Sequence, residues 1–190
     1  MLRSLLLLFP FVLLPARSTA QQPLDLIPYP ASVARGTGTF TFDADTRLRT
    51  ESAAQQQVAD FFTGQYALAT GWDLLAPGRG RNAITVRQDT NLGDEAYRLE
   101  VTADEITLDA GSLHALVYGL QTLRQLLPPA FEDSTTVTDV AWEIPQLTIE
   151  DEPRFAWRGL MLDVSRHFFP VEYIKETIDR MAFLKLNTLH

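Results

Sequence analysis

Apolar and polar residues alternate along three short segments of the chain, residues 39–42, 97–101 and 106–109. Alternation with a period of two is typical of strands that have one buried and one solvated face. Residues 83–87 and, more weakly, residues 47–50 are further strand candidates. The connection between the last two alternating segments is short enough for a hairpin. This pattern predicts an antiparallel sheet in the N-terminal part of the chain.

Helical periodicity marks two stretches that would cover this sheet. Ser52 and Gln55 have the spacing of a capping box before the first helix, and Gly71 is a suitable stop. The apolar stripe expected to face the sheet consists of Val58, Phe61, Phe62, Leu68 and Ala69. A second stripe runs through residues 113–127, and two prolines end it. The fold class predicted for this part is an α+β domain, an antiparallel sheet with helices on one face.

The pattern changes near the C-terminal end. Residues 159–162 form a continuous apolar run, which is typical of a strand buried on both faces. Pro170 suits the first position of a helix, and a helical stripe follows through Val171, Ile174, Ile178 and Met181. A second apolar run begins at residue 186. The order strand, helix, strand predicts a parallel crossover, and a unit of this size indicates the opening of a larger domain.

Composition narrows the possible functions. The chain has 190 residues, no Cys and a net charge of −8. Nucleic-acid binding depends on clustered Lys and Arg, so an acidic chain argues against it. The absence of Cys excludes disulfides, thiolate metal sites and cysteine nucleophiles. The 3 His residues show no spacing suited to a metal site, so we expect neither a metal nor a cofactor.

Residues 1–20 have the organisation of a secretory signal peptide. Arg3 precedes an apolar run over residues 5–14, and small residues lead to a cleavage site after Ala20. Ten apolar residues make about 15 Å of helix, too short for a hydrocarbon core of roughly 30 Å. We therefore expect an exported protein, periplasmic or extracellular, with no membrane anchor once the signal is cleaved.

Residues 149–169, IEDEPRFAWRGLMLDVSRHFF, closely resemble glycoside hydrolase family 20, the β-N-acetylhexosaminidases. The helix segment YGLQTLRQL at residues 118–126, the IPYP opening at 27–30 and the segment MAFLKLNTLH at 181–190 are similar to that family as well. These segments extend over nearly all of the mature chain and occur in the family's order. The segment that ends in Arg-His-Phe is the specific part of the resemblance.

The signal-peptide pattern and the two-part enzyme that the resemblance implies together divide the chain into three regions. Residues 1–20 would be the signal peptide, residues 21–150 an α/β N-terminal domain of hexosaminidase type, and residues 151–190 the start of an incomplete (β/α)8 TIM-barrel catalytic domain. Within the barrel, residues 157–163 would form the first strand and residues 171–184 the first helix. Residues 187–190 would begin the second strand. A complete barrel needs about 250 residues, so the chain is expected to be an N-terminal fragment.

The resemblance also implies the reaction. The family removes terminal β-linked N-acetylhexosamine, GlcNAc or GalNAc, from glycans or chitooligosaccharides by a retaining, substrate-assisted mechanism. The substrate's acetamido oxygen attacks the anomeric carbon, a Glu protonates the leaving oxygen and an adjacent Asp orients the acetamido group. That Asp-Glu pair is expected beyond His190, so no catalytic residue is assigned here. The fragment alone is expected to be inactive.

Arg166 is the residue carried over as a substrate contact. The matching Arg of the family hydrogen-bonds hydroxyls at the non-reducing end of the sugar, and a guanidinium can reach two adjacent oxygens at once. Arg166 follows the C-terminal end of the first barrel strand, the end at which barrel active sites lie. The alternative for Arg166 is an ion pair with a carboxylate at the barrel mouth. Asp163, at the strand end, is expected to line the pocket, hold Arg166 in place or serve the structure alone.

Other charged residues are expected to be structural. Arg158 starts the first barrel strand, at the end away from the site, and is predicted to form an ion pair at the barrel floor. The acidic runs 94–95 and 150–152 are predicted to be solvated loop charges.

Two other hypotheses compete with the interpretation of the chain as part of a family 20 β-N-acetylhexosaminidase. The chain could be a non-catalytic α/β module that binds carbohydrate or a partner protein. It could also belong to a glycosidase of another family with a similar N-terminal domain, although the specific motif within residues 149–169 argues against that hypothesis.

Overall fold

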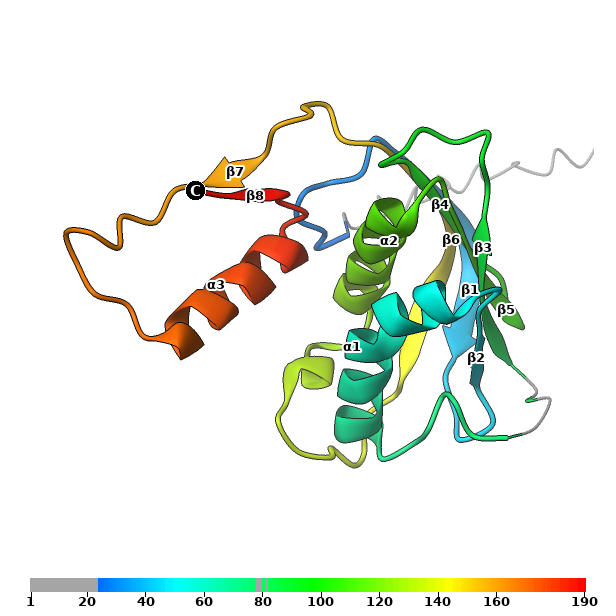
Figure 1. Cartoon of the computed structure of the whole chain (residues 1–190). Helices are drawn as coiled ribbons and strands as arrows, with labels where there is room; N and C mark the ends of the chain where they lie inside the picture. Colours follow the sequence, from blue (N-terminus) through cyan, green and yellow to red (C-terminus); the bar gives the residue numbers. More distant parts are fainter. Residues whose placement is uncertain (1–23, 78–79, 81) are drawn as a thin grey trace, which may run out of the picture.

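The computed structural model describes residues 24–77, 80 and 82–190 (Figure 1). The predicted signal peptide lies outside the described residues. Six strands form one sheet in the order β1-β6-β4-β5-β3-β2. The strands are β1 (Ser32–Thr41), β2 (Arg47–Arg49), β3 (Ala83–Gln88), β4 (Tyr97–Val101), β5 (Glu105–Ala110) and β6 (Glu143–Asp151). Helices α1 (Ala53–Thr70) and α2 (Leu113–Leu126) cover one face of this sheet (Figure 1), and a short 3₁₀ helix spans Pro129–Glu132.

The sheet is mixed, so the prediction of an antiparallel sheet is wrong in part. Strands β1, β6, β4 and β5 pair antiparallel, and the β4–β5 hairpin is confirmed. Strand β3 pairs parallel with both β5 and β2. The helix α1 forms the crossover between β2 and β3, and a crossover connection makes its two strands parallel. Alternation reports which face of a strand is buried and says nothing about the direction of its neighbour, so the sequence pattern could not reveal this.

The local signals at the ends of α1 are confirmed. The Ser52 hydroxyl accepts a hydrogen bond from the Gln55 backbone N–H (3.2 Å). The Gln55 side chain accepts one from the backbone N–H of Glu51 (2.7 Å), which completes a reciprocal cap one residue earlier than expected. Gly71 follows the helix with φ of 75°, a left-handed conformation that glycine adopts without a Cβ clash.

The buried face of α1 differs from the predicted stripe. Phe61 and Leu68 were expected to face the sheet and are instead exposed. The buried positions include Ala59, Phe62, Tyr66 and Ala69. Tyr66 is absent from the predicted stripe, yet its aromatic ring is buried one turn after Phe62, since a tyrosine combines a large apolar ring with a polar hydroxyl.

A second, smaller unit follows the sheet domain. Strand β7 (Gly159–Leu160) and strand β8 (Thr188–Leu189) pair parallel, and α3 (Val171–Phe183) connects them. The predicted parallel crossover is therefore confirmed, with strands shorter than expected. Pro170 caps the helix as the residue before it, not as its first residue. Val171 and Ile178 of the predicted stripe are exposed, because nothing among the described residues packs over that face.

The core of the sheet domain lies between the sheet and its two helices. It contains side chains with essentially no exposed surface, among them Phe40, Phe62, Leu99, Leu108, Leu116 and Phe131. Gly119 of α2 packs directly against the Leu108 side chain of β5, which leaves no room for a Cβ at this position. Within the described part of the chain, no helix combines the length and apolar character that a membrane span requires.

Candidate functional site

The turn after β7 holds the two residues predicted for the substrate site. The Asp163 carboxylate accepts hydrogen bonds from the backbone N–H groups of Ser165 (3.0 Å) and Arg166 (3.1 Å). Its other oxygen pairs with the Arg166 Nε at 3.3 Å. The Arg166 side chain is 85% exposed and points into solvent. Asp163 thus shapes this turn and holds the guanidinium, while sugar binding by either residue stays a prediction.

At the opposite end of β7, Arg158 joins the small unit to the sheet domain. Its guanidinium donates to both oxygens of Glu95, at 2.7 and 3.0 Å, and to the Tyr118 hydroxyl at 2.7 Å. The remaining N–H groups donate to the backbone oxygens of Phe155 (2.7 Å) and Lys185 (2.9 Å). All five guanidinium donors therefore have acceptors, a pattern that a lysine ammonium could not reproduce.

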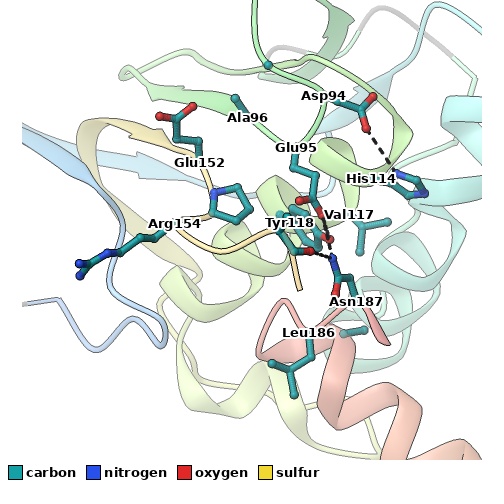
Figure 2. A pocket seen from close by; sticks show the side chains of 14 residues that line it. Asp94, Glu95, Ala96, His114, Val117, Tyr118, Glu152, Arg154, Leu186 and Asn187 are labelled. Carbon is teal, nitrogen blue, oxygen red and sulfur yellow. Dashed lines mark hydrogen bonds and ion pairs between the residues drawn. The ribbon is translucent and has the colours of Figure 1, made fainter. Parts of the chain in front are cut away.

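The predicted ion pair of Arg158 is confirmed, and its partner corrects another prediction. Glu95 was expected to be a solvated loop charge, but its side chain is only 24% exposed and lies against Arg158. Tyr118 donates its hydroxyl hydrogen to Glu95 (2.7 Å), and the Asn187 side-chain amide approaches the same oxygen at 3.4 Å (Figure 2). The turn before β4, helix α2 and the starts of β7 and β8 meet at this carboxylate.

The electrostatics of this cluster keep Glu95 ionised and Tyr118 protonated near neutral pH. Hydrogen bonds from Arg158, with a further one from Tyr118, lower the pKa of Glu95 to about 2. Burial and the hydrogen bond to Glu95 raise the pKa of Tyr118 to about 12. A general acid or base works best with a pKa near the operating pH. Neither group meets that condition near neutral pH, so the cluster serves to hold the two parts together.

A cavity of about 750 Å³ opens beside this cluster, between α2, the segment before β7 and the start of β8 (Figure 2). On its rim, Asp94 and His114 lie 3.9 Å apart and both are largely exposed. Glu152 and Arg154 also border it, with the Arg154 guanidinium directed away from Glu95 (Figure 2). Glu95, Tyr118 and Asn187 hydrogen-bond to one another, so these three polar side chains of the lining are occupied by internal hydrogen bonds.

A second ion pair lies nearby and was missed by the sequence reasoning. Lys185 Nζ contacts Asp151 Oδ2 at 2.8 Å, and both side chains are nearly buried. Asp151 was expected to be a solvated charge, which is wrong. No local pattern marks either residue, because Asp151 sits in an acidic run and Lys185 in a short turn between α3 and β8. Among the residues that the structure describes, no group of three His, Cys, Asp or Glu side chains is placed to hold a metal ion.

The fold and this arrangement define a two-part α/β protein, in which a parallel strand-helix-strand unit joins a mixed-sheet domain at the start of β4, the end of β6 and helix α2. Residues 24–152 match the family described as glycosyl hydrolase family 20, domain 2. Residues 155–190 match the glycosyl hydrolase family 20 catalytic domain. The chain belongs to glycosyl hydrolase family 20, as its sequence motifs indicated.

Individual relatives agree with this assignment. The chain is 33% identical over 172 residues to a Porphyromonas gingivalis beta-hexosaminidase, a match that covers 88% of the chain and 22% of the relative. A GH20 beta-N-acetylhexosaminidase structure from Streptomyces coelicolor superposes with a TM-score of 0.83 at 41% identity, over 89% of this chain and 35% of that one. A mutant Streptomyces plicatus beta-hexosaminidase in complex with its product GlcNAc gives a TM-score of 0.81 at 42% identity, over 89% and 34%. The chain thus spans about a fifth to a third of the lengths of these proteins.

Proposed function

We propose that the full-length polypeptide to which this chain belongs is an exported β-N-acetylhexosaminidase. It removes terminal β-linked GlcNAc or GalNAc from glycans or chitooligosaccharides, with retention of configuration and with the substrate's own acetamido group as nucleophile. The general acid and its neighbouring Asp are assigned to residues outside these 190. The chain itself supplies the N-terminal domain, the first strand-helix-strand unit of the barrel and one sugar contact, Arg166.

The position of Arg166 carries this proposal. Its turn follows the C-terminal end of β7, and α3 comes after it, which is the place where βα loops build the site of a (β/α)8 barrel. The Arg158 cluster occupies the other end of the same strand. Asp163 orients the Arg166 guanidinium through one nitrogen, and the exposed remainder points to solvent. A guanidinium held in this way offers paired donors to two neighbouring hydroxyls of a sugar.

The activity is tested on the full-length polypeptide. We expect release of p-nitrophenol from p-nitrophenyl N-acetyl-β-D-glucosaminide and from the galactosaminide. The matching β-glucoside, which lacks the acetamido group, should not react. The 190-residue chain alone should be inactive on all three. A full-length polypeptide that hydrolyses none of them would contradict the proposal and favour a module that only binds.

The role of Arg166 has a matched control on the same chain. Arg166→Ala removes two charge-assisted hydrogen bonds to the sugar and is expected to lower kcat/KM about hundredfold, equivalent to about 3 kcal/mol. Arg180→Ala removes an exposed arginine that also pairs with a carboxylate on its own segment, Glu176 at 3.6 Å, and should leave kcat/KM unchanged. Equal effects of the two substitutions would exclude Arg166 as a specific sugar contact.

Export is tested separately from activity. Secretion of the protein followed by N-terminal sequencing should give a mature chain that starts at Gln21. A mature protein that retains residues 1–20 would contradict the signal peptide.

A further inference from the structure

Lys185 is a buried lysine whose side-chain partners lie in the sheet domain. Its side chain donates to Asp151 at the end of β6 and to the Tyr97 hydroxyl at the start of β4, both at 2.8 Å. The Tyr97 hydroxyl also lies 2.7 Å from the hydroxyl of Thr122 in α2. The ammonium stands 4.9 Å from the centre of the Tyr97 ring, within cation–π range. One lysine from the small unit thus contacts two strands of the sheet domain and is linked to helix α2 through the Tyr97 hydroxyl.

The backbone of Lys185 is unusual as well. Its φ is 58°, a left-handed conformation in which a side chain with a Cβ is disfavoured and glycine or asparagine is common. A non-glycine residue holds this conformation where the surrounding contacts over-determine it. Lys185 therefore adopts a conformation that the backbone disfavours locally, at a point where its ammonium contacts Asp151 and Tyr97.

Lys185 also connects the two ion pairs to each other. Its carbonyl accepts the Arg158 Nε hydrogen at 2.9 Å, while Arg158 pairs with Glu95. The backbone oxygen of Arg158 accepts from the N–H of Asn187 at 2.8 Å, at the start of β8. The two cations and two carboxylates form one connected group, and every member of it lies at the N-terminal ends of β7 and β8 or in the sheet domain.

The parallel pair β7–β8 depends on support of this kind. Two-residue strands in a parallel pair have few hydrogen bonds of their own, and a two-stranded sheet is marginal in water. Apolar packing does little for this unit, because only Thr177, Met181 and Lys185 are buried in residues 155–190. The polar group beneath the strands therefore provides much of their attachment to the sheet domain.

We propose that Lys185 is a positioning residue, through which the sheet domain fixes the start of the barrel. By holding the α3–β8 turn and Arg158 against Asp151 and Glu95, it sets where β7 lies and so where its far end presents the turn of Asp163 and Arg166. The sheet domain then serves as a template for the first parallel strands. The effect on sugar binding rests on the function proposed above, whereas the effect on β7 and β8 does not.

The structural half is tested by NMR-detected hydrogen exchange on the 190-residue chain. Two reporters belong to the strand pair, the His190 N–H bonded to Leu160 and the Leu162 N–H bonded to His190. The reference is the hairpin amide of Thr102, bonded to Glu105. Lys185→Met keeps the length of the side chain and removes its charge, and we expect the reporters to exchange at least tenfold faster with the reference unchanged.

Three further variants make the result specific. Lys175→Met removes an exposed lysine of α3 and should change neither reporter. Lys185→Gly relieves the left-handed backbone and still loses the ion pair, so fast exchange is expected again. Asp151→Asn should act like Lys185→Met, and combining the two should add little, since both remove one interaction. Slow exchange in Lys185→Met or Lys185→Gly, or equal acceleration of the reference amide, would overturn the proposal.

The effect of Lys185 on the position of Arg166 is tested by enzyme kinetics on the full-length polypeptide. Lys185→Met should lower kcat/KM at least tenfold, and adding Arg166→Ala should lower it no further than Arg166→Ala alone, because Lys185 acts through that turn. Additive losses would overturn the positioning of Arg166. If the wild-type polypeptide hydrolyses no hexosaminide, the proposed function fails, while the exchange result on β7 and β8 stands on its own.

Discussion

The sheet domain and the strand-helix-strand unit use their apolar residues differently. In the sheet domain, large side chains such as Phe62 and Leu108 have no exposed surface. In the small unit, Trp157, Met161 and Phe168 are 67%, 69% and 89% exposed. The first part is held by apolar packing between a sheet and its helices, whereas the second is held largely by ion pairs and hydrogen bonds of Arg158 and Lys185 to the sheet domain. Similar apolar patterns in a sequence therefore need not produce similar cores.

The reason lies in the architecture of the two sheets. A mixed sheet with one covered face can complete its core with two helices, and α1 and α2 provide them. A parallel pair needs cover on both faces, and β7 and β8 are covered only in part, since Leu160 and Leu189 are exposed. Three substitutions test this difference, in order of their expected effect on the unfolding of the sheet domain.

The largest effect is expected from the packed core. Phe62→Ala leaves a cavity among Phe131 and Tyr66, the rings that surround it, and should lower the free energy of unfolding by about 3–5 kcal/mol. Phe168→Ala removes a ring of the same size from an exposed position and should change it by less than about 0.5 kcal/mol. Urea denaturation followed by circular dichroism measures both. Equal effects would mean that the two parts do not differ in packing.

An intermediate effect is expected where α2 meets the sheet. A Cβ on Gly119 would overlap a methyl carbon of Leu108, so Gly119→Ala should lower the free energy of unfolding by about 1–3 kcal/mol. Gly64→Ala is the control, because a Cβ there meets nothing within 4 Å. Alanine favours the helix, and this variant should gain about 0.5–1 kcal/mol in the same denaturation experiment. A neutral Gly119→Ala would show that α2 can move away from the sheet.

Glu95→Gln is expected to have the smallest effect on the unfolding of the sheet domain. Its main effect should be to weaken the junction, the contact of Glu95 with Arg158 that joins the sheet domain to the strand-helix-strand unit. The folded-state pKa of Glu95 is about 2, below its ordinary value of 4.5. The stabilisation that the ionised Glu95 carboxylate contributes is therefore present above pH 4.5 and is lost as the pH falls from 4.5 towards 2. The Arg158 Nε–H resonance in ¹⁵N NMR should shift over that range in the wild type. In Glu95→Gln it should resemble a released guanidinium already at pH 7.

The proteolytic counterpart of this experiment uses trypsin at pH 7. Glu95→Gln should be cut faster after Arg154 and Arg158, while urea unfolding of the sheet domain changes by less than about 0.5 kcal/mol. Two outcomes would contradict the idea that polar contacts attach the small unit without stabilising the sheet domain. One is a fall of several kcal/mol in the free energy of unfolding of the sheet domain, and the other is an Arg158 resonance that shifts with pH as much in the variant as in the wild type.

Local structure was predictable from neighbouring residues. Ser52, Gln55 and Gly71 specify the ends of α1, and the short connection between β4 and β5 specifies a hairpin. The crossover from β7 through α3 to β8 follows from two apolar runs around a helical stripe. The family was recognisable for a similar reason, because its motif is contiguous in the chain. At the ends of α1 and in the hairpin the interacting groups are close in the sequence, so the local pattern contains the information. The crossover was predictable because the order strand, helix, strand favours parallel pairing.

What only the tertiary structure decided involves residues far apart in the sequence. Arg158 was predicted to have a carboxylate partner, but Glu95 lies 63 positions away, and Asp151 is separated from Lys185 by 34. The parallel direction of β3 and the exposure of Phe61 depend in the same way on which elements become neighbours. The sequence around a charged residue does not indicate which distant residue will pair with it. Whether Glu95 and Asp151 are solvated or paired is settled only when the strand-helix-strand unit docks on the sheet, since docking removes water and brings Arg158 and Lys185 within hydrogen-bonding distance.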